Sequence, residues 1–347
     1  QLSNMGLRTI ILYLLTTLTA VSIGLGIVNV IKPGNSLSET TRTELLNSYA
    51  NDAAKKQSVA EVQKDAGPLQ ALVDLVPSNI FSALQDNGNM LQVIFFALLF
   101  GLALVLIPKK KSKPVKDFID SANDVILKLI DLIMLTAPYG VFALLAAIVV
   151  EAPSLDLFKA LGLYTITVIC GLALMILFYV TIVRIITGKK IGNFLKGISS
   201  AQLLAFSTSS SAATLPVTME CVTDKLDVEE EVSSFVLPIG ATINMDGTSL
   251  YQAVAAVFIA QAFGIDLNFS AQVGIILTAT LASIGSAAVP GAGMVMLVIV
   301  LAQAGIPEAG LALIFAVDRP LDMCRTSINV TGDASVSMIV SKLLKAK

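Results

Sequence analysis

The sequence predicts an all-α protein that crosses a membrane several times, and composition and uncharged runs carry this expectation. Charged residues make up 14% of the 347 positions and apolar residues 55%, whereas a typical soluble domain has about 25% charged residues. The mean hydropathy is +0.81. Several uncharged runs reach about 20 residues, the length of helix that crosses about 30 Å of hydrocarbon. The fold class is therefore a polytopic helical membrane protein.

Four uncharged runs are predicted to span the membrane in the first half of the chain. They are residues 10–31, 89–108, 133–150 and 161–183. Residues 32–76 are polar and of mixed sign, so we expect them to form a loop outside the hydrocarbon.

The orientation of the spans follows from the basic residues. Lys109, Lys110, Lys111, Lys113 and Lys116 follow the second run directly. The positive-inside rule places this lysine loop in the cytoplasm, where we expect it to be solvated and without a binding role. Counting spans from it puts residues 32–76 outside, and the following list inside: Arg8, Arg184, Lys189, Lys190 and Lys196.

Composition also excludes several functions. The net charge is −2, and no basic and aromatic patch that would bind nucleic acid is present. Without a histidine, the chain has no histidine metal ligand, general base or proton relay. Cys170, Cys221 and Cys324 lack metal-type spacing and are interpreted as small buried thiols.

The first run begins only nine residues after Gln1. It is too long for the apolar part of a signal peptide and has no small-residue cleavage site. We expect a further N-terminal part to precede this numbering.

From Ser199 onward the apolar stretches become shorter and are interrupted by Ser, Gly, Asn and Pro. Such breaks are tolerated at membrane depth only where they face protein or a water-filled cavity. The four polar interruptions are 207–211 (STSSS), 244–248 (NMDGT), 283–293 (SIGSAAVPGAG) and the polar face of 318–333.

These interruptions repeat in the same order. SAATLP at 211–216 returns loosely as SAAVP at 286–290, and NMDGT at 244–248 returns as NVTGD at 329–333. The chain thus carries two copies of a short hairpin followed by a broken or polar helix. Paired interrupted segments indicate a transport site near the midplane, commonly between inverted repeats.

Five polar residues of the last interruption share one face of a predicted helix. Asp318, Asp322, Arg325, Asn329 and Asp333 are spaced by three or four residues, so they fall within an arc of roughly 80°. One Asp or Arg at the centre of a membrane helix costs about 2.5 to 3.5 kcal/mol, so four ionisable groups cost on the order of 10 kcal/mol before pairing.

Two interpretations of this face stay open. One is an internal ladder in which Arg325 and Asp322 neutralise each other. The other is a binding site, favoured because three acids face one arginine and Asp246 adds a fourth acid. An excess of carboxylates attracts hard cations, which prefer oxygen ligands. An arginine is suited to binding a carboxylate through two hydrogen bonds. Asp322, one turn away, can hold an ammonium group.

The hairpin tips also have two interpretations. Residues 207–211 are suited to helix capping, and free N–H groups at half-helix N-termini also attract a carboxylate. Residues 290–293 (PGAG) are a turn whose glycines would let the hairpin move as a gate.

These motifs resemble the dicarboxylate/amino acid:cation symporter family, which includes archaeal aspartate transporters and mammalian excitatory amino acid transporters. The resemblance covers essentially all 347 residues. It is most specific in the hairpins 207–211 and 283–293, in NMDGT, and in residues 322–333 with DMCR and NVTGD.

The resemblance implies a glutamate-transporter-like fold with two re-entrant helical hairpins, inverted repeats, a homotrimer and an elevator movement. The multi-pass chain would lie in the inner or plasma membrane, with the first two family helices absent from this numbering. The implied parts are 1–31 (third helix, transport domain), 32–152 (scaffold and trimerisation, extracellular loop 32–76), 153–198 (sixth helix, transport domain), 199–228 (hairpin 1), 229–264 (broken helix 7), 270–306 (hairpin 2) and 307–347 (helix 8).

The resemblance also implies roles for single residues. Arg325 would bind the side-chain carboxylate of an acidic amino acid, and Asp322 its amino group. Further substrate contacts would come from Asn329, Thr326, Thr248, Ser209, Ser210 and Val289. Three sodium sites are implied: Asp333 with Asn329, Asn244 and the Gly240 carbonyl; a second near Thr242, Met245, Ser283, Ile284 and Ser286; and a third formed by Asp246 and Asn244 with Tyr13, Thr16 and Thr17.

Two departures from the family pattern matter. Archaeal members of the family carry an arginine where Thr208 stands, and mammalian members carry it where Met323 stands. This chain has neither, but Arg319 lies nearby in the sequence. Our hypothesis is that Arg319 reaches Asp318 or Asp322 and replaces the family arginine as a brace. Gln252 stands where mammalian members have a proton-carrying glutamate, so proton coupling of that kind is not expected.

Three classes of function compete. A secondary transporter predicts paired broken segments with mixed charges, which the sequence has. A channel would need a pore lined by repeated like residues, so at most a minor anion conductance is expected. An intramembrane enzyme would need a nucleophile and its base, which the apolar runs lack. Among transport substrates, Arg325 with Asp322 favours aspartate or glutamate, and a sodium- or proton-coupled C4-dicarboxylate carrier is the alternative.

Overall fold

Helices make up all the regular structure in the described part of the chain. This computed structural model describes residues 2–40, 43, 76–85, 90–136, 139, 142–143, 156–284, 286, 288 and 290–345. The all-helical architecture expected from the composition is therefore confirmed for these residues.

Two long apolar helices flank the bundle. α1 (Leu2–Ile31) contains the predicted run 10–31, and α9 (Asp156–Thr187) contains the run 161–183. Within the described residues, these two helices have the length and composition to cross a membrane. Each has a buried face and a face with exposed large apolar side chains, such as Leu15 and Leu177. That division fits a helix between protein and lipid.

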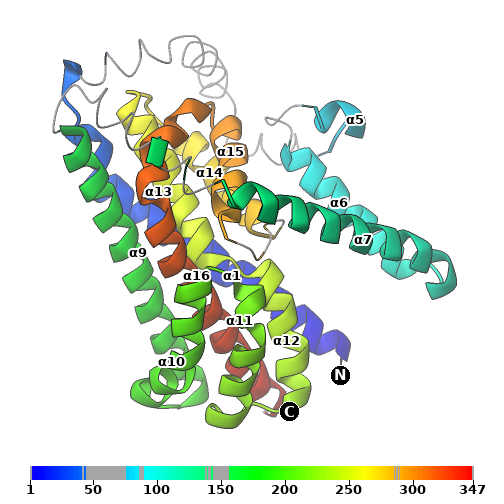
Figure 1. Cartoon of the computed structure of the whole chain (residues 1–347). Helices are drawn as coiled ribbons and strands as arrows, with labels where there is room; N and C mark the ends of the chain where they lie inside the picture. The colour runs from blue at the N-terminus through cyan, green and yellow to red at the C-terminus, as the bar shows by residue number, and fades with distance from the viewer. Residues whose placement is uncertain are drawn as a thin grey trace.

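α6 (Met90–Leu106) and α7 (Lys109–Met134) lie beside each other and project from the main bundle, next to the short α5 (Ile80–Ala83) (Figure 1). The lysine cluster that we expected in a loop lies in the first turns of α7. Lysine is a good helix former, so the charge run begins the helix. Most of the predicted run 133–150 and of the loop 32–76 lies outside the described residues.

Two pairs of helices bring their connecting turns together. α10 (Ile191–Thr208) is followed by α11 (Ser211–Glu220) and a π-helical turn, η3 (Cys221–Lys225). α14 (Phe269–Ile284) is followed by α15 (Ala292–Gln303). In Figure 1, α10 and α11 lie in the lower part of the bundle and α14 and α15 in the upper part.

A broken helix and a continuous one run between these pairs. α12 (Glu230–Ile243) stops two residues before α13 (Asp246–Ala262), which is buried along nearly its whole length. α16 (Leu311–Lys345) is unbroken. Short 3-10 turns, η1 (Pro33–Ser36) and η4 (Glu308–Gly310), follow α1 and precede α16. Three of the four predicted interruptions are thus helix ends, and the fourth is a polar stretch inside a helix.

The apolar core is divided into two clusters. One contains Leu250 of α13 and Ile328 of α16, together with much of α9. The other contains Val236 of α12 and Val330 of α16, together with α10. On α16 the residue between Ile328 and Val330 is Asn329. We call the buried polar residues near this junction the polar layer. Ile176 of α9 packs against both clusters, so the two apolar halves remain in contact.

Basic residues expected inside the cell lie at one end of the bundle. Arg8 of α1 donates from Nη1 to the Leu343 carbonyl of α16 (2.8 Å). Lys189, after α9, pairs with Asp227 (2.8 Å), and Lys345 pairs with Glu229 (3.3 Å). The N-terminus of α1 and the C-termini of α9 and α16 therefore share one side, in agreement with the predicted orientation.

The Lys189–Asp227 contact gives the first testable prediction. The hydrogen bond and charge of Lys189 hold the pKa of Asp227 below its usual range. The contact therefore stabilises the fold above the unfolded-state pKa of about 3.9, and this stabilisation is lost as pH falls through the lowered folded pKa. We expect Asp227→Asn to have a slightly lower Tm than the parent chain at pH 7. At the acid end of the pH range, the two chains should have the same Tm.

The measurement is the Tm of both chains in detergent between pH 7 and pH 3. Asn also tolerates the left-handed backbone of Asp227 (φ 59°), so the comparison isolates the charge. Asp224→Asn, an exposed carboxylate in the preceding turn, is the control. A Tm difference that is the same at every pH would contradict the prediction.

Candidate functional site

Four aspartates and one arginine are buried in the polar layer. Asp246, Asp318, Asp322 and Asp333 are each at most 9% exposed, and Arg325 is 0% exposed. Arg325 is the one buried cationic side chain among the described residues. The layer thus carries a formal excess of three negative charges.

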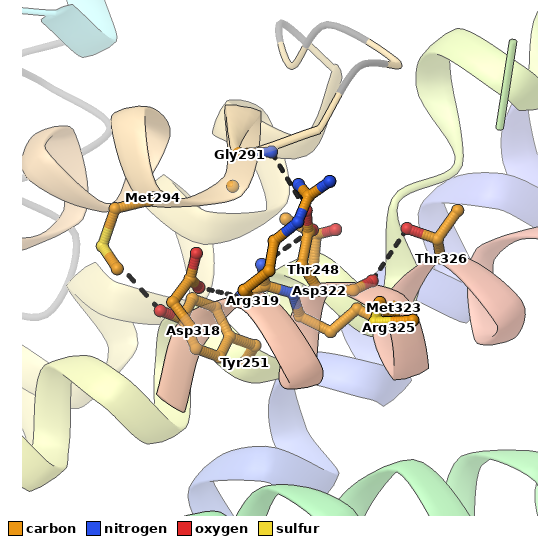
Figure 2. Close-up of polar contacts among 12 residues, drawn as sticks. Thr248, Tyr251, Gly291, Met294, Asp318, Arg319, Asp322, Met323, Arg325 and Thr326 are labelled. Atoms are coloured by element: carbon orange, nitrogen blue, oxygen red, sulfur yellow. Dashed lines mark hydrogen bonds and ion pairs between the residues drawn. The ribbon is translucent and has the colours of Figure 1, made fainter. Parts of the chain in front are cut away.

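Arg325 of α16 is held by its own helix. Nη1 donates to Asp318 Oδ1 (3.0 Å), and Nη2 donates to Asp322 Oδ1 (2.8 Å) (Figure 2). The guanidinium carbon lies 3.7 Å from the ring centroid of Tyr251 on α13, a cation–π contact. Nε has no hydrogen-bond partner. The arginine is fixed from three sides, and its Nε–H donor is unused.

Asp322 also contacts the turn between α14 and α15. Its Oδ2 accepts from the Gly291 backbone N–H (3.0 Å), as Figure 2 shows. Gly291 has φ +79°, a conformation that suits glycine. On the other side of the turn, Ser210 Oγ donates to the Ala288 carbonyl (2.7 Å). The two predicted hairpin tips therefore meet over Asp322.

Arg319 reaches Asp322, as one form of our hypothesis expects. Its Nη1 lies 3.6 Å from Asp322 Oδ2, and its side chain is 50% exposed. The ion pair adds positive charge at the rim of the layer. The substitution Arg319→Ala tests whether this arginine acts as a brace.

We expect Arg319→Ala to weaken binding of an acidic substrate by about 1.4- to fivefold. An exposed ion pair contributes roughly 0.2 to 1 kcal/mol, and 1.4 kcal/mol corresponds to tenfold. The effect should shrink at high ionic strength because exposed charges are screened. Substrate affinity is measured at two salt concentrations, with Arg319→Lys as the charge-conserving control. Unchanged affinity and transport would rule out the brace.

The side chains of the first implied sodium site lie together. Asn244 Nδ2 donates to Asp333 Oδ1 (2.8 Å) and to the Asn329 carbonyl (3.2 Å). Asn244 Oδ1 is buried and has no hydrogen-bond partner. The Gly240 carbonyl accepts from the Asn244 backbone N–H (2.8 Å) and keeps a second lone pair. Asp333 is in none of the ion pairs recorded among the described residues.

The residues of the third implied site gather around Asp246. Oδ1 accepts from Thr17 Oγ (2.6 Å), and Oδ2 accepts from the Tyr179 hydroxyl of α9. Thr16 Oγ donates to the Tyr13 carbonyl (3.1 Å), and the Tyr13 hydroxyl donates to the Val236 carbonyl (3.1 Å). α1 and α9 thus both contribute to the surroundings of this carboxylate.

Some residues of the second implied sodium site also lie close together. Ser283 Oγ contacts the Met245 backbone N–H (3.3 Å) and the Ile243 carbonyl (3.2 Å). Ser286 is buried with an unpartnered hydroxyl. Thr242, by contrast, is exposed, and its hydroxyl donates to the carbonyl of Ile239 (3.0 Å). Ile284 is partly buried at the end of α14.

The remaining implied substrate contacts line one small pocket. Asn329 Nδ2 lies 3.3 Å from Thr248 Oγ1, and its Oδ1 accepts from the Gly247 N–H (2.8 Å). Thr326 Oγ1 donates to the Asp322 carbonyl (2.9 Å). Ser209 Oγ is buried and unpartnered. Val289 lies outside the described residues.

The pocket is polar and very small. Its walls include Ser209, Thr248, Ser286, Asp322 and Asn329. Its volume of about 10 Å³ is the space of about one water molecule. An amino acid does not fit this volume unless some of the lining residues move.

Two tyrosines at the site were not found from the sequence. Tyr251 stacks on Arg325, and Tyr179 contacts Asp246. A weak signal existed, because a buried tyrosine hydroxyl usually has a hydrogen-bond partner. The run 161–183 was interpreted only as apolar.

Known proteins match almost the whole chain. A family model described as the sodium:dicarboxylate symporter family matches residues 1–343. Excitatory amino acid transporter 3 of Mus musculus is 37% identical over 379 residues, covering 99% of this chain and 72% of the relative. Excitatory amino acid transporter 1 of Ambystoma tigrinum is 37% identical, covering 98% and 70%. The proton/sodium-glutamate symport protein of Bacillus subtilis (strain 168) is 36% identical, covering 99% and 77%.

Proposed function

The chain belongs to the sodium:dicarboxylate symporter family, and from this premise we propose that it couples inward sodium movement to the uptake of aspartate or glutamate. The similarity to excitatory amino acid transporters and to a proton/sodium-glutamate symporter supports the class of substrate and ion. Membership in a family of transporters is consistent with a chain that is not an enzyme.

One observation carries the choice of substrate: a fully buried arginine shares its charge between two aspartates, one of which also contacts the hairpin turn. An acidic amino acid brings a side-chain carboxylate and an ammonium group. The carboxylate takes the place of an aspartate on Arg325, and Asp322 is then free to accept the ammonium. Arg325, Asp318 and Asp322 each keep a partner of opposite charge during this exchange, which avoids the several kcal/mol cost of an unpaired buried ion.

Closure of the site follows from the same contacts. For entry, the Gly291 N–H releases Asp322 and Ser210 releases Ala288. Both bonds can form again over the bound substrate and exclude water. The α14–α15 turn is therefore the gate of this proposal, and the unpartnered donors and hydroxyls of Arg325, Ser209 and Ser286 are available to substrate oxygens.

Sodium is the cargo that balances the remaining charge. Three sodium ions would cancel the excess of three negative charges in the polar layer. The Asn244 Oδ1 beside Asp333 is a hard oxygen ligand with no other partner. Asp246 with Thr17, and Ser283 with Ser286, supply oxygens for two further sites. Thr242 would have to turn its hydroxyl inward to contribute.

The larger movement is an elevator in this proposal. Residues 1–31 and 153–347 would form the transport domain, and 32–152 the scaffold of a homotrimer in the inner or plasma membrane. The two re-entrant hairpins would be 199–228, which holds the end of α10 and all of α11, and 270–306, which holds most of α14 and all of α15. The meeting of their tips at the polar layer supports this assignment.

A C4-dicarboxylate symporter is the second candidate, because such a substrate would also pair with Arg325. It would leave Asp322 without an ammonium partner, so the amino acid satisfies more of the site.

The decisive experiment is uptake by the chain in proteoliposomes. We expect labelled aspartate or glutamate to accumulate when a sodium gradient points inward, and not when sodium is replaced by choline. Unlabelled succinate should compete poorly. Uptake without sodium dependence, or a preference for succinate, would overturn the proposed function.

A further inference from the structure

Asp246 has its two oxygens bound by two hydroxyl groups from different helices. Thr17 of α1 donates to Oδ1 (2.6 Å), and Tyr179 of α9 donates to Oδ2. Asp246 is 0% exposed and takes part in none of the ion pairs recorded within the described ranges. The orientation of this buried carboxylate therefore depends on two neutral donors.

The Tyr179 hydroxyl also lies close to the hydrogen-bonded pair of Asn244 and Asp333. It is 0% exposed. A Cβ atom built on Gly332 of α16 would collide with both the Tyr179 hydroxyl and Asn244 Nδ2. Asn244 Nδ2 is the donor to Asp333 Oδ1. The tyrosine hydroxyl thus lies in the wall between Asp246 and the Asn244–Asp333 pair, and the missing side chain of Gly332 leaves room for it.

A phenol is suited to this position for a chemical reason. It is neutral, so it does not compete with a cation for the charge of Asp246. Its O–H fixes one carboxylate oxygen, and its oxygen lone pairs stay available as acceptors. Groups that orient the ligands of a metal ion typically change its affinity by 10- to 100-fold when they are removed.

We propose that Tyr179 is a positioning residue for sodium: by holding Asp246 Oδ2 it orients the carboxylate toward a cation bound among α1, α12 and α13. α9 thereby connects the Asp246 site to Gly332 and Asp333 of α16. The inference rests on the proposed sodium coupling and adds a residue from a helix otherwise assigned only to packing.

Tyr179→Phe tests the role of the hydroxyl while keeping the ring and its packing. The full chain is purified in detergent, and two quantities are measured across a sodium titration: the Tm without substrate, and the affinity for aspartate. The sodium concentration for the half-maximal rise in Tm should increase by about tenfold or more. Aspartate affinity at saturating sodium should return to within about twofold of the parent value, because Arg325 and Asp322 are unchanged.

Tyr164→Phe is the matched control. It removes another buried hydroxyl from α9, 15 residues and about 22 Å along the helix from Tyr179. Its sodium titration should follow that of the parent chain. A purely structural role for Tyr179 would lower the Tm equally at all sodium concentrations and leave the half-maximal concentration unchanged, which would overturn the inference.

The role of Tyr179 and the proposed sodium coupling can be disproved separately. If the parent chain binds aspartate with sodium dependence and Tyr179→Phe has the same titration, only the role of Tyr179 is lost. If the parent chain shows no sodium dependence in either measurement, the proposed coupling and this inference are both wrong.

Discussion

Arg325→Cys is expected to abolish uptake of aspartate and glutamate at concentrations that saturate the parent chain. Removing one partner from a buried, hydrogen-bonded charge pair costs about 2 to 5 kcal/mol. At 1.4 kcal/mol per tenfold, the loss of affinity is about 30-fold to several thousand-fold. The cysteine leaves a small neutral space above Tyr251, so the preference should move toward neutral amino acids such as serine.

The measurement is competition by acidic and neutral amino acids in sodium-driven proteoliposome uptake. Arg184→Cys, which changes an exposed arginine of α9, controls for the loss of an arginine and the gain of a thiol. Because Arg325 also neutralises Asp318 and Asp322, the variant should have a lower Tm than the control. Retained high-affinity aspartate uptake would show that another group binds the substrate carboxylate.

Asp333→Asn is the second large effect, and its two consequences have opposite signs. The asparagine has nearly the same shape but no charge, so a cation among Asn244, Asn329 and position 333 loses its anionic ligand. We expect sodium-driven transport to disappear. In sodium-free buffer, however, the variant should be more stable than the parent chain, because a buried carboxylate without a cationic partner is costly.

Thermal unfolding with and without sodium separates these consequences. The Tm of the parent chain should rise with sodium as expected for a ligand that binds only the folded state, and that of Asp333→Asn should rise much less. Asp224→Asn, at an exposed carboxylate, should behave like the parent chain. A variant that is less stable than the parent in sodium-free buffer would contradict an ion-binding role for Asp333.

Much of the polar layer could be predicted because its signals are local. The face of Asp318, Asp322, Arg325, Asn329 and Asp333 follows from helical spacing alone, and the structure places all five residues, buried, inside one continuous helix. The turns at Ser209–Ser210, Asn244–Met245 and Gly291 were visible as clusters of residues that interrupt helices. Local chemistry is thus sufficient to predict which polar residues gather in this layer.

The partners across helices could not be predicted in this way. Tyr179 and Tyr251 meet their partners only after α9 and α13 pack against α16, and a single tyrosine in an apolar run gives no direction to its hydroxyl. The sequence also left open whether Arg325 would pair internally or with a ligand. The structure records both internal pairs, with Asp318 and with Asp322. In the exchange that we propose, these pairs are part of substrate binding.

The division of the apolar core into two clusters has a consequence for folding. Hydrophobic contacts hold each half of the bundle together, whereas between the halves apolar contacts such as those of Ile176 are supplemented by hydrogen bonds and ion pairs and, in the proposed function, by bound ions. The sodium concentration would then set how strongly the two halves of the bundle are coupled to each other. In low sodium, hydrogen exchange should reveal the two halves opening separately, whereas in high sodium they should open as one unit.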